Sequence, residues 1–166
     1  MSQGRLSLLA LIVAVAALTL TFVGRGTPTA NGDWLRGTPR EQTPILEKHL
    51  RGLDVAMFEI GYRFTELYFA GQDGNWDYAK YHAEKIDLAL RLALERRPKR
   101  SASSQPFLNE ALPVVMKAIE SQDQAQFDEA MERLRSSCMK CHTDEQVPHF
   151  TVEFPEHRLA PIRTMR

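Results

Sequence analysis

The sequence predicts an all-α protein whose helices form an antiparallel four-helix bundle. Apolar residues recur at alternating steps of three and four along four separate segments after Asp33, a spacing typical of amphipathic helices. Proline, glycine or capping residues mark the ends of these segments. Because the connections between them are short, successive helices are expected to lie side by side and to run in opposite directions.

The first helix is expected to begin at Thr43-Pro44, where a capping residue precedes a proline suited to the first helical turn. Gly71 is its expected C-terminal stop. Between these points the apolar residues form one continuous stripe along a single helix face. The stripe consists of Leu46, Leu50, Leu53, Met57, Ile60, Phe64 and Leu67.

The second helix is expected to run from about Trp76 to Arg96, because Pro98 disfavours its continuation. Its narrower stripe consists of Ala79, Ala83, Ile86, Leu90 and Ala93. Residues 99–104 are polar and predict a linker.

The third helix is expected to start near Pro106. Its apolar face consists of Phe107, Leu108, Ala111, Leu112, Val115 and Ile119. Pro113 lies inside this segment, where it is expected to kink the helix or to remove one of its hydrogen bonds.

The fourth helix is expected to begin at Asp123, since Gln126 follows three residues later as in a capping box. Its stripe consists of Phe127, Met131, Leu134, Cys138 and Cys141. This helix completes the predicted domain at residues 33–145. Residues 146–166 contain three prolines and predict an extended C-terminal tail. In an antiparallel bundle the fourth helix ends beside the start of the first.

Residues 1–32 are expected to form a signal peptide or membrane anchor with a linker. Arg5 precedes an apolar run at residues 6–23, and no acidic residue occurs before Asp33, which is typical of an export segment. The run of about 18 residues just suffices to span a bilayer, so an uncleaved anchor is slightly favoured over a cleaved signal. Both alternatives place the domain on the exported side of a membrane.

The sequence Ser137-Cys138-Met139-Lys140-Cys141-His142 contains the Cys-x-x-Cys-His signature of c-type haem attachment. Two cysteines one helical turn apart face the same side of a helix, so both sulfurs can form thioethers to one haem. The adjacent histidine can then bind the iron. The sequence therefore predicts one covalently bound haem c on Cys138, Cys141 and His142.

Three other readings of the motif are weaker. A structural zinc site needs four protein ligands, and the chain has two cysteines. A redox dithiol is expected where a strand meets a helix, and no strand is predicted. A catalytic Cys–His pair is disfavoured because Cys141 and His142 are consecutive on a helix and point apart.

Four helices with Cys-x-x-Cys-His on the last one resemble the class II cytochromes c, the cytochrome c′ family. The resemblance covers residues 43–142. It implies a periplasmic bacterial haem protein that is often a homodimer. Some members of this family are five-coordinate and bind nitric oxide or carbon monoxide, whereas others place a methionine of the first helix on the iron.

The second axial ligand is expected from the early half of the first helix. Met57 lies on the apolar stripe there, and its thioether can bind iron; the alternatives are that Met57 is a core residue or that the iron is open. His49 and Met116 are weaker candidates. His82 is expected to be packed or solvated at the far end of the bundle. His149 and His157 are expected on the surface, although the tail can fold back over the haem edge.

Several charged and aromatic residues allow two readings. The cations Arg135, Lys140, Arg158 and Arg163 are expected to be solvated, and the alternative is that one of them pairs with a haem propionate. The aromatic residues Trp76, Tyr78 and Tyr81 are expected to pack.

The predicted function is electron transfer by a monohaem cytochrome with redox partner proteins. No acid–base pair, metal cluster or phosphate loop predicts an enzyme. The 21 basic and 21 acidic residues balance, which gives no indication of nucleic-acid binding. The alternatives are a gas-binding haem protein and a haem subunit of a larger oxidoreductase, with the tail as its docking element.

Overall fold

The structure is a computed structural model that describes residues 34–158. These residues form helices and no strand, so the predicted all-α class is confirmed for this part of the chain. The chain divides into one compact unit that ends at His49 and another that begins at Leu50, whereas the predicted domain began at residue 33. Within residues 34–158 no helix combines the length and apolarity needed to cross a membrane. The predicted anchor at residues 6–23 lies outside the described residues.

Helix α2 (Pro39–Leu50) belongs almost entirely to the first unit and begins earlier than predicted. The carboxylate of Glu41 accepts hydrogen bonds from the backbone N–H and the hydroxyl of Thr38, at 2.7 and 2.8 Å. This pairing of Thr38 with Glu41, and Pro39 in the first turn, is a start signal that the sequence analysis missed. The expected start at Thr43-Pro44 is therefore wrong, and Pro44 lies inside the helix.

The predicted first helix is broken at Arg51-Gly52, and its second part is α3 (Leu53–Gln72). Arg51 has a positive φ of 55°, a conformation that ends an α-helix. Leu46 and Leu50 are 39% and 57% exposed, so the buried stripe begins only with Leu53. Periodicity alone hid the break because apolar residues keep the helical spacing on both sides of it.

Gly71 lies inside α3 and does not end it, contrary to the prediction. A Cβ atom at this position would come within 2.0 Å of the Phe127 ring. The absence of a side chain therefore allows α3 and α7 to approach each other closely.

Helix α4 (Trp76–Arg96) has the predicted bounds. The Asn75 side chain caps it by accepting the backbone N–H of Tyr78 at 3.3 Å. All five residues of its predicted stripe are buried: Ala79, Ala83, Ile86, Leu90 and Ala93.

The residues predicted as a linker are helical, which corrects that prediction. A 3₁₀ turn η1 (Pro98–Arg100) leads into α5 (Ser101–Pro106), the π-helical turn η2 (Phe107–Ala111) and α6 (Leu112–Ser121). The Ser103 and Ser104 hydroxyls donate to the Arg100 carbonyl at 3.0 and 2.9 Å. The π-helical turn directly precedes Pro113, which lacks an N–H for the helical ladder. The expected distortion at Pro113 is thus present.

Helix α7 (Gln124–Asp144) is capped as predicted, since the Asp123 carboxylate accepts the backbone N–H of Gln126 at 2.9 Å. Phe127, Met131 and Leu134 are fully buried, whereas Cys138 and Cys141 are partly buried. The stripe of this helix therefore leads from the core to a less covered region at the C-terminal end.

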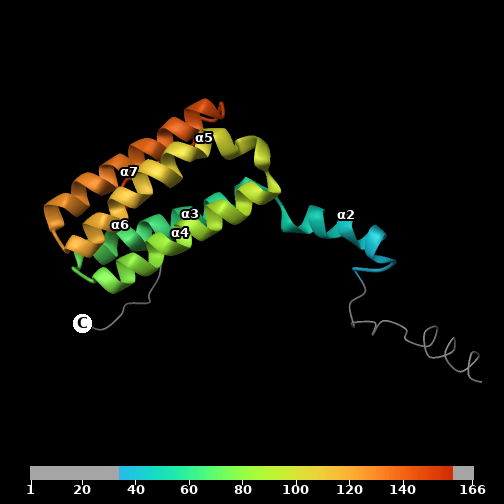
Figure 1. Ribbon diagram of the computed structural model, residues 1–166, viewed down its shortest axis with the longest axis horizontal. Helices are drawn as coiled ribbons and strands as arrows, with labels where there is room; N and C mark the ends of the chain where they lie inside the picture. The colour runs from blue at the N-terminus through green and yellow to red at the C-terminus, as the bar shows by residue number, and fades with distance from the viewer. Residues whose placement is uncertain (1–33, 159–166) are drawn as a thin grey trace, which may run out of the picture. The chain divides into compact units, whose positions relative to one another are not determined.

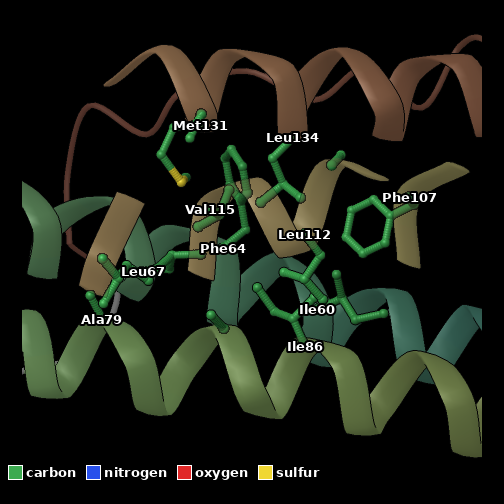
Figure 2. Packing of buried hydrophobic residues seen from close by; sticks show 14 of the residues in the cluster. Ile60, Phe64, Leu67, Ala79, Ile86, Phe107, Leu112, Val115, Met131 and Leu134 are labelled. Atoms are coloured by element: carbon green, nitrogen blue, oxygen red, sulfur yellow. The ribbon is translucent and has the colours of Figure 1, made fainter. Parts of the chain in front are cut away.

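The helices of the second unit pack around one apolar core. Helix α3 lies along α4, α6 lies along α7, and α4 and α6 are also in contact (Figure 1). The side chains that point inward come from every one of these helices (Figure 2). They include Ile60, Phe64, Leu67, Ile86, Phe107, Leu112, Val115, Met131 and Leu134. This core fixes the ends of α3 and α7 relative to each other.

A buried polar cluster lies between α3 and α4. Glu66 is fully buried and His82 is 1% exposed, and Tyr78 donates its hydroxyl to Glu66 at 3.3 Å. Burial raises the pKa of Tyr78 to about 12, and the Glu66 charge adds to this rise. Neither ring nitrogen of His82 has a hydrogen-bond partner among the described residues. Burial, and then the charge of Arg63, lowers the pKa of His82 from 6.5 to about 4. His82 is therefore packed and neutral in the folded protein.

We expect the stability of the His82→Phe variant to fall less on acidification than that of the wild type. Between pH 6.5 and 4 the unfolded chain binds a proton at His82 that the folded chain does not bind, so stability falls as pH falls through this window. The full loss in the free energy of unfolding is on the order of 3 kcal/mol. Phenylalanine does not bind a proton, so the variant should not show this loss. Urea unfolding at pH 7 and pH 4.5 measures the difference. The exposed His149 provides the control His149→Gln, which should retain the wild-type slope; an equal slope in His82→Phe would contradict the assignment.

Candidate cofactor site

A pocket of about 570 Å³ lies where the start of α3 meets the end of α7. This volume is within the range of small-molecule and cofactor sites. Apolar side chains form most of its lining, together with a few polar groups. The lining residues are Leu53, Asp54, Met57, Phe58, Ile60, Leu90, Arg100, Ser104, Phe107, Cys138, Cys141, His142, Glu145, Val147 and Phe150. All three residues of the Cys-x-x-Cys-His motif that carry its chemistry belong to this set.

Cys138 and Cys141 are free thiols on successive turns of α7 and line the same pocket. The Cys141 sulfur lies 3.9 Å from the Ser104 hydroxyl. Burial raises the pKa of the Cys138 thiol to about 12, and the neighbouring Cys141 adds to this rise. A thiol that stays protonated is a poor nucleophile, which disfavours Cys138 as the attacking thiol of a redox dithiol.

The His142 ring has one nitrogen engaged by the protein. Its Nδ1 atom lies 2.5 Å from the backbone carbonyl of Phe150. A carbonyl oxygen only accepts hydrogen bonds, so Nδ1 donates and carries the proton of the neutral ring. The Nε2 atom is then the unprotonated nitrogen and is free to bind a metal ion.

Among the candidates for a second ligand, the structure brings Met57 into the pocket of Cys138, Cys141 and His142. Met57 is partly buried and packs against the core. His49 lies in the other compact unit, where its ring is 4.7 Å from the Trp34 ring. Met116 lines a separate groove between α4 and α6.

The two tail histidines, His149 and His157, are exposed and do not line the pocket. Trp76 and Tyr78 pack against the core as expected, whereas Tyr81 is 44% exposed.

Arg100 is a site residue that the sequence analysis missed. It forms an ion pair with Glu145, whose carboxylate also accepts the Ser103 hydroxyl. Arg100 is the only arginine or lysine among the described residues that line the pocket. No periodic signal marked it, because residues 99–104 have the composition of a linker.

The four cations considered from sequence are not in this lining. Arg135 pairs with Glu132, Lys140 with Asp144 at 2.7 Å, and Arg158 with Asp73. Arg163 lies outside the described residues.

The chain was compared with known proteins. No family model, curated protein or solved structure matches it. Residues 34–158 also contain no group of three or more histidine, cysteine or acidic side chains arranged to hold a metal ion. Two thiols, one imidazole and one thioether line the same mostly apolar pocket.

Proposed function

We propose that the protein is a monohaem c-type cytochrome that transfers electrons between partner proteins on the exported side of a membrane. One observation carries the proposal: Cys138, Cys141 and His142 line the same apolar pocket as Met57. Neither the spacing of the motif nor the periodicity of α3 requires such a meeting. Under this proposal the protein is not an enzyme.

The residues present fit a covalently attached haem. Each thiol would add across one vinyl group of the haem, so that a carbon–sulfur bond would form and the thiol hydrogen would go to the other vinyl carbon. Both cysteines are free for this addition. His142 offers Nε2 because Nδ1 is engaged, and Met57 offers its thioether from α3. When bound, haem supplies an iron that changes oxidation state by one electron, and its surroundings set the potential.

The other lining residues have supporting roles in this proposal. Leu53, Ile60, Leu90 and Phe107 exclude water from the pocket, which favours the less charged form of a buried redox group. Arg100 is the cation best placed for the propionates, because it lines the pocket and is half exposed. In that arrangement a propionate competes with Glu145 for its guanidinium group.

We also infer that α3, α4, the α5–α6 segment and α7 form an antiparallel up-down-up-down bundle. Two contacts support this inference. Helices α3 and α4 pack together across the short connection Asp73–Asn75, and α6 and α7 pack together across Gln122-Asp123. In such a bundle the motif at the end of α7 faces the start of α3, as the pocket requires.

The absorption spectrum of purified full-length protein, expressed with export, tests the proposal. We expect haem bands that persist after denaturing electrophoresis and a reversible change on reduction with dithionite. A low-spin oxidised spectrum is expected if Met57 binds the iron. Exported protein that shows no haem-stained band after purification would contradict the proposal. A high-spin oxidised spectrum would instead favour the gas-binding alternative.

A further inference from the structure

The chain after α7 turns back and packs on the helices. Val147 N–H donates to the His142 carbonyl at 2.8 Å, and Phe150 N–H donates to the Val147 carbonyl at 3.1 Å. Residues Val147–Arg158, here called the tail strap, have no regular secondary structure beyond turns and bends. This described part of the predicted tail therefore lacks helix and strand, and it packs against helices of the same chain.

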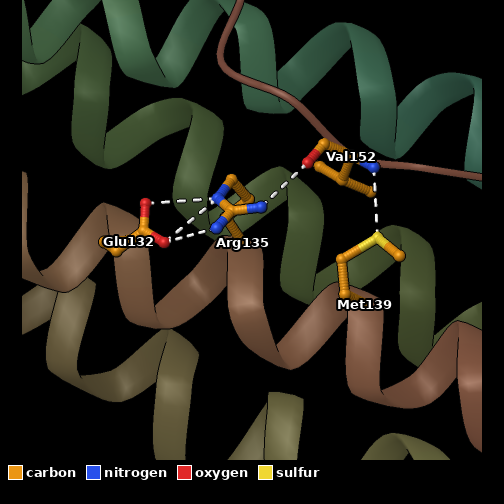
Figure 3. Close-up of polar contacts among 4 residues, drawn as sticks. All are labelled: Glu132, Arg135, Met139 and Val152. Atoms are coloured by element: carbon orange, nitrogen blue, oxygen red, sulfur yellow. Dashed lines mark hydrogen bonds and ion pairs between the residues drawn. The ribbon is translucent and has the colours of Figure 1, made fainter.

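The tail strap is held at its middle by α7. The Val152 N–H donates to the Met139 sulfur at 3.2 Å, and Arg135 donates to the Val152 carbonyl at 3.4 Å (Figure 3). Glu132 holds the same guanidinium group from the other side, at 2.5 to 3.2 Å. Val152 is thus fixed through both of its backbone polar groups.

Further along, the tail strap is anchored on α3. The Phe154 ring stacks on Phe64 and Tyr68, with centroid distances of 6.0 and 5.1 Å. Arg158 pairs with Asp73 and donates to the Phe69 carbonyl at 3.3 Å. These contacts lie along α3 away from the pocket, so they hold the strap without touching His142.

The contact that matters for the site is the one between Phe150 and His142. It is a backbone carbonyl, so its position depends on the path of the tail strap and not on the Phe150 side chain. A hydrogen bond to the second ring nitrogen fixes the tautomer and orientation of a ligating histidine and makes the ligand more basic. Contacts at Val152 and Phe154 therefore determine how His142 presents Nε2.

We propose that the tail strap is a positioning element that orients His142 through the Phe150 carbonyl and lowers the reduction potential of the site. This inference rests on the proposed haem attachment. A more basic imidazole stabilises the oxidised iron more than the reduced iron, so the intact strap favours the oxidised form. The strap thereby acts on the ligand through a backbone carbonyl, and its residues Val147 and Phe150 also line the pocket.

The test uses the full-length holoprotein and the variant Phe154→Ala. Loss of the ring stack should free the strap and weaken the hydrogen bond to Nδ1. We expect the haem to stay attached and the reduction potential to rise. In the Met57→Ala background, where the reduced iron binds carbon monoxide, we expect Phe154→Ala to lower the iron–histidine stretching frequency of the photoproduct. Phe154→Tyr retains the stack and should restore both wild-type values. Met116→Ala removes a partly buried side chain away from the strap and should change neither value.

Each outcome separates this inference from the proposed function. If the wild type carries no haem, the proposed function is wrong and the inference falls with it. If haem is attached but Phe154→Ala keeps the wild-type potential and stretching frequency, the inference alone is overturned. If Phe154→Ala does not accumulate, Arg135→Gln provides the same comparison, because it removes a strap contact without opening the core.

Discussion

Replacing both Cys138 and Cys141 with alanine is expected to abolish haem attachment completely. Both sulfurs line one pocket on successive turns of α7, and no other cysteine is present in the chain. Haem staining after denaturing electrophoresis measures the effect, because only thioether-linked haem survives denaturation. Ser104→Ala is the matched control: it removes a hydroxyl 3.9 Å from the Cys141 sulfur but no attachment point, so its band should persist.

The same double variant is expected to loosen the fold around the pocket. The pocket lining is mostly apolar and Phe58 is 82% exposed, so the haem-free protein presents a large apolar area to water. At roughly 25 cal/mol per Å² of apolar surface, losing the burial that a haem provides approaches a small domain's whole margin of stability. We expect weak near-ultraviolet dichroism and poorly dispersed amide spectra. A haem-stained band in the double variant would contradict the attachment, and a sharp, dispersed spectrum would contradict the coupling to folding.

Met57→Ala is expected to convert a low-spin oxidised protein into a high-spin one that reacts with carbon monoxide in its reduced form. The side chain lines the pocket from α3, and alanine has no atom that can bind the iron. Absorption and electron paramagnetic resonance spectra measure the change, which should be complete rather than partial.

Two matched variants separate ligation from packing. Leu53→Ala removes a side chain from the same wall of the pocket without removing a ligand atom, so its spectrum should stay low-spin. His49→Ala should also retain the wild-type spectrum. If His49→Ala opens the iron instead, the ligand assignment is wrong. If the wild type is already high-spin, the gas-binding alternative becomes the better account of the pocket.

The helices that sequence predicted well carry a clear boundary signal of their own. Helix α4 is followed by Pro98, and α7 has a cap at Asp123. The break at Arg51 escaped prediction because only one residue takes a left-handed conformation there, and arginine gives no local sign of it. Gly71 was predicted to end the helix, but its role is to leave room for Phe127 of α7, a contact between helices that are distant in sequence.

The candidate site likewise contains residues that could be predicted from the sequence and groups that could not. The motif on α7 is local and could be placed from sequence, and the expectation that Met57 faces it rested on the predicted antiparallel path of the helices; both line the same pocket. Arg100 and the Phe150 carbonyl could not be placed from sequence. One lies in a segment with the composition of a linker and the other is a backbone atom of an irregular tail, and both reach the site only through tertiary contacts.

The position of the tail strap in the chain has a consequence for the order of assembly. Val147 and Phe150 belong both to the strap and to the lining of the pocket, yet they follow every helix found within residues 34–158. During synthesis the helices and both thiols therefore emerge before this wall of the pocket exists. If the protein carries the proposed haem, we expect this wall to form last, when Phe154 and Arg158 reach α3, so that the haem enters the pocket before the tail strap narrows it.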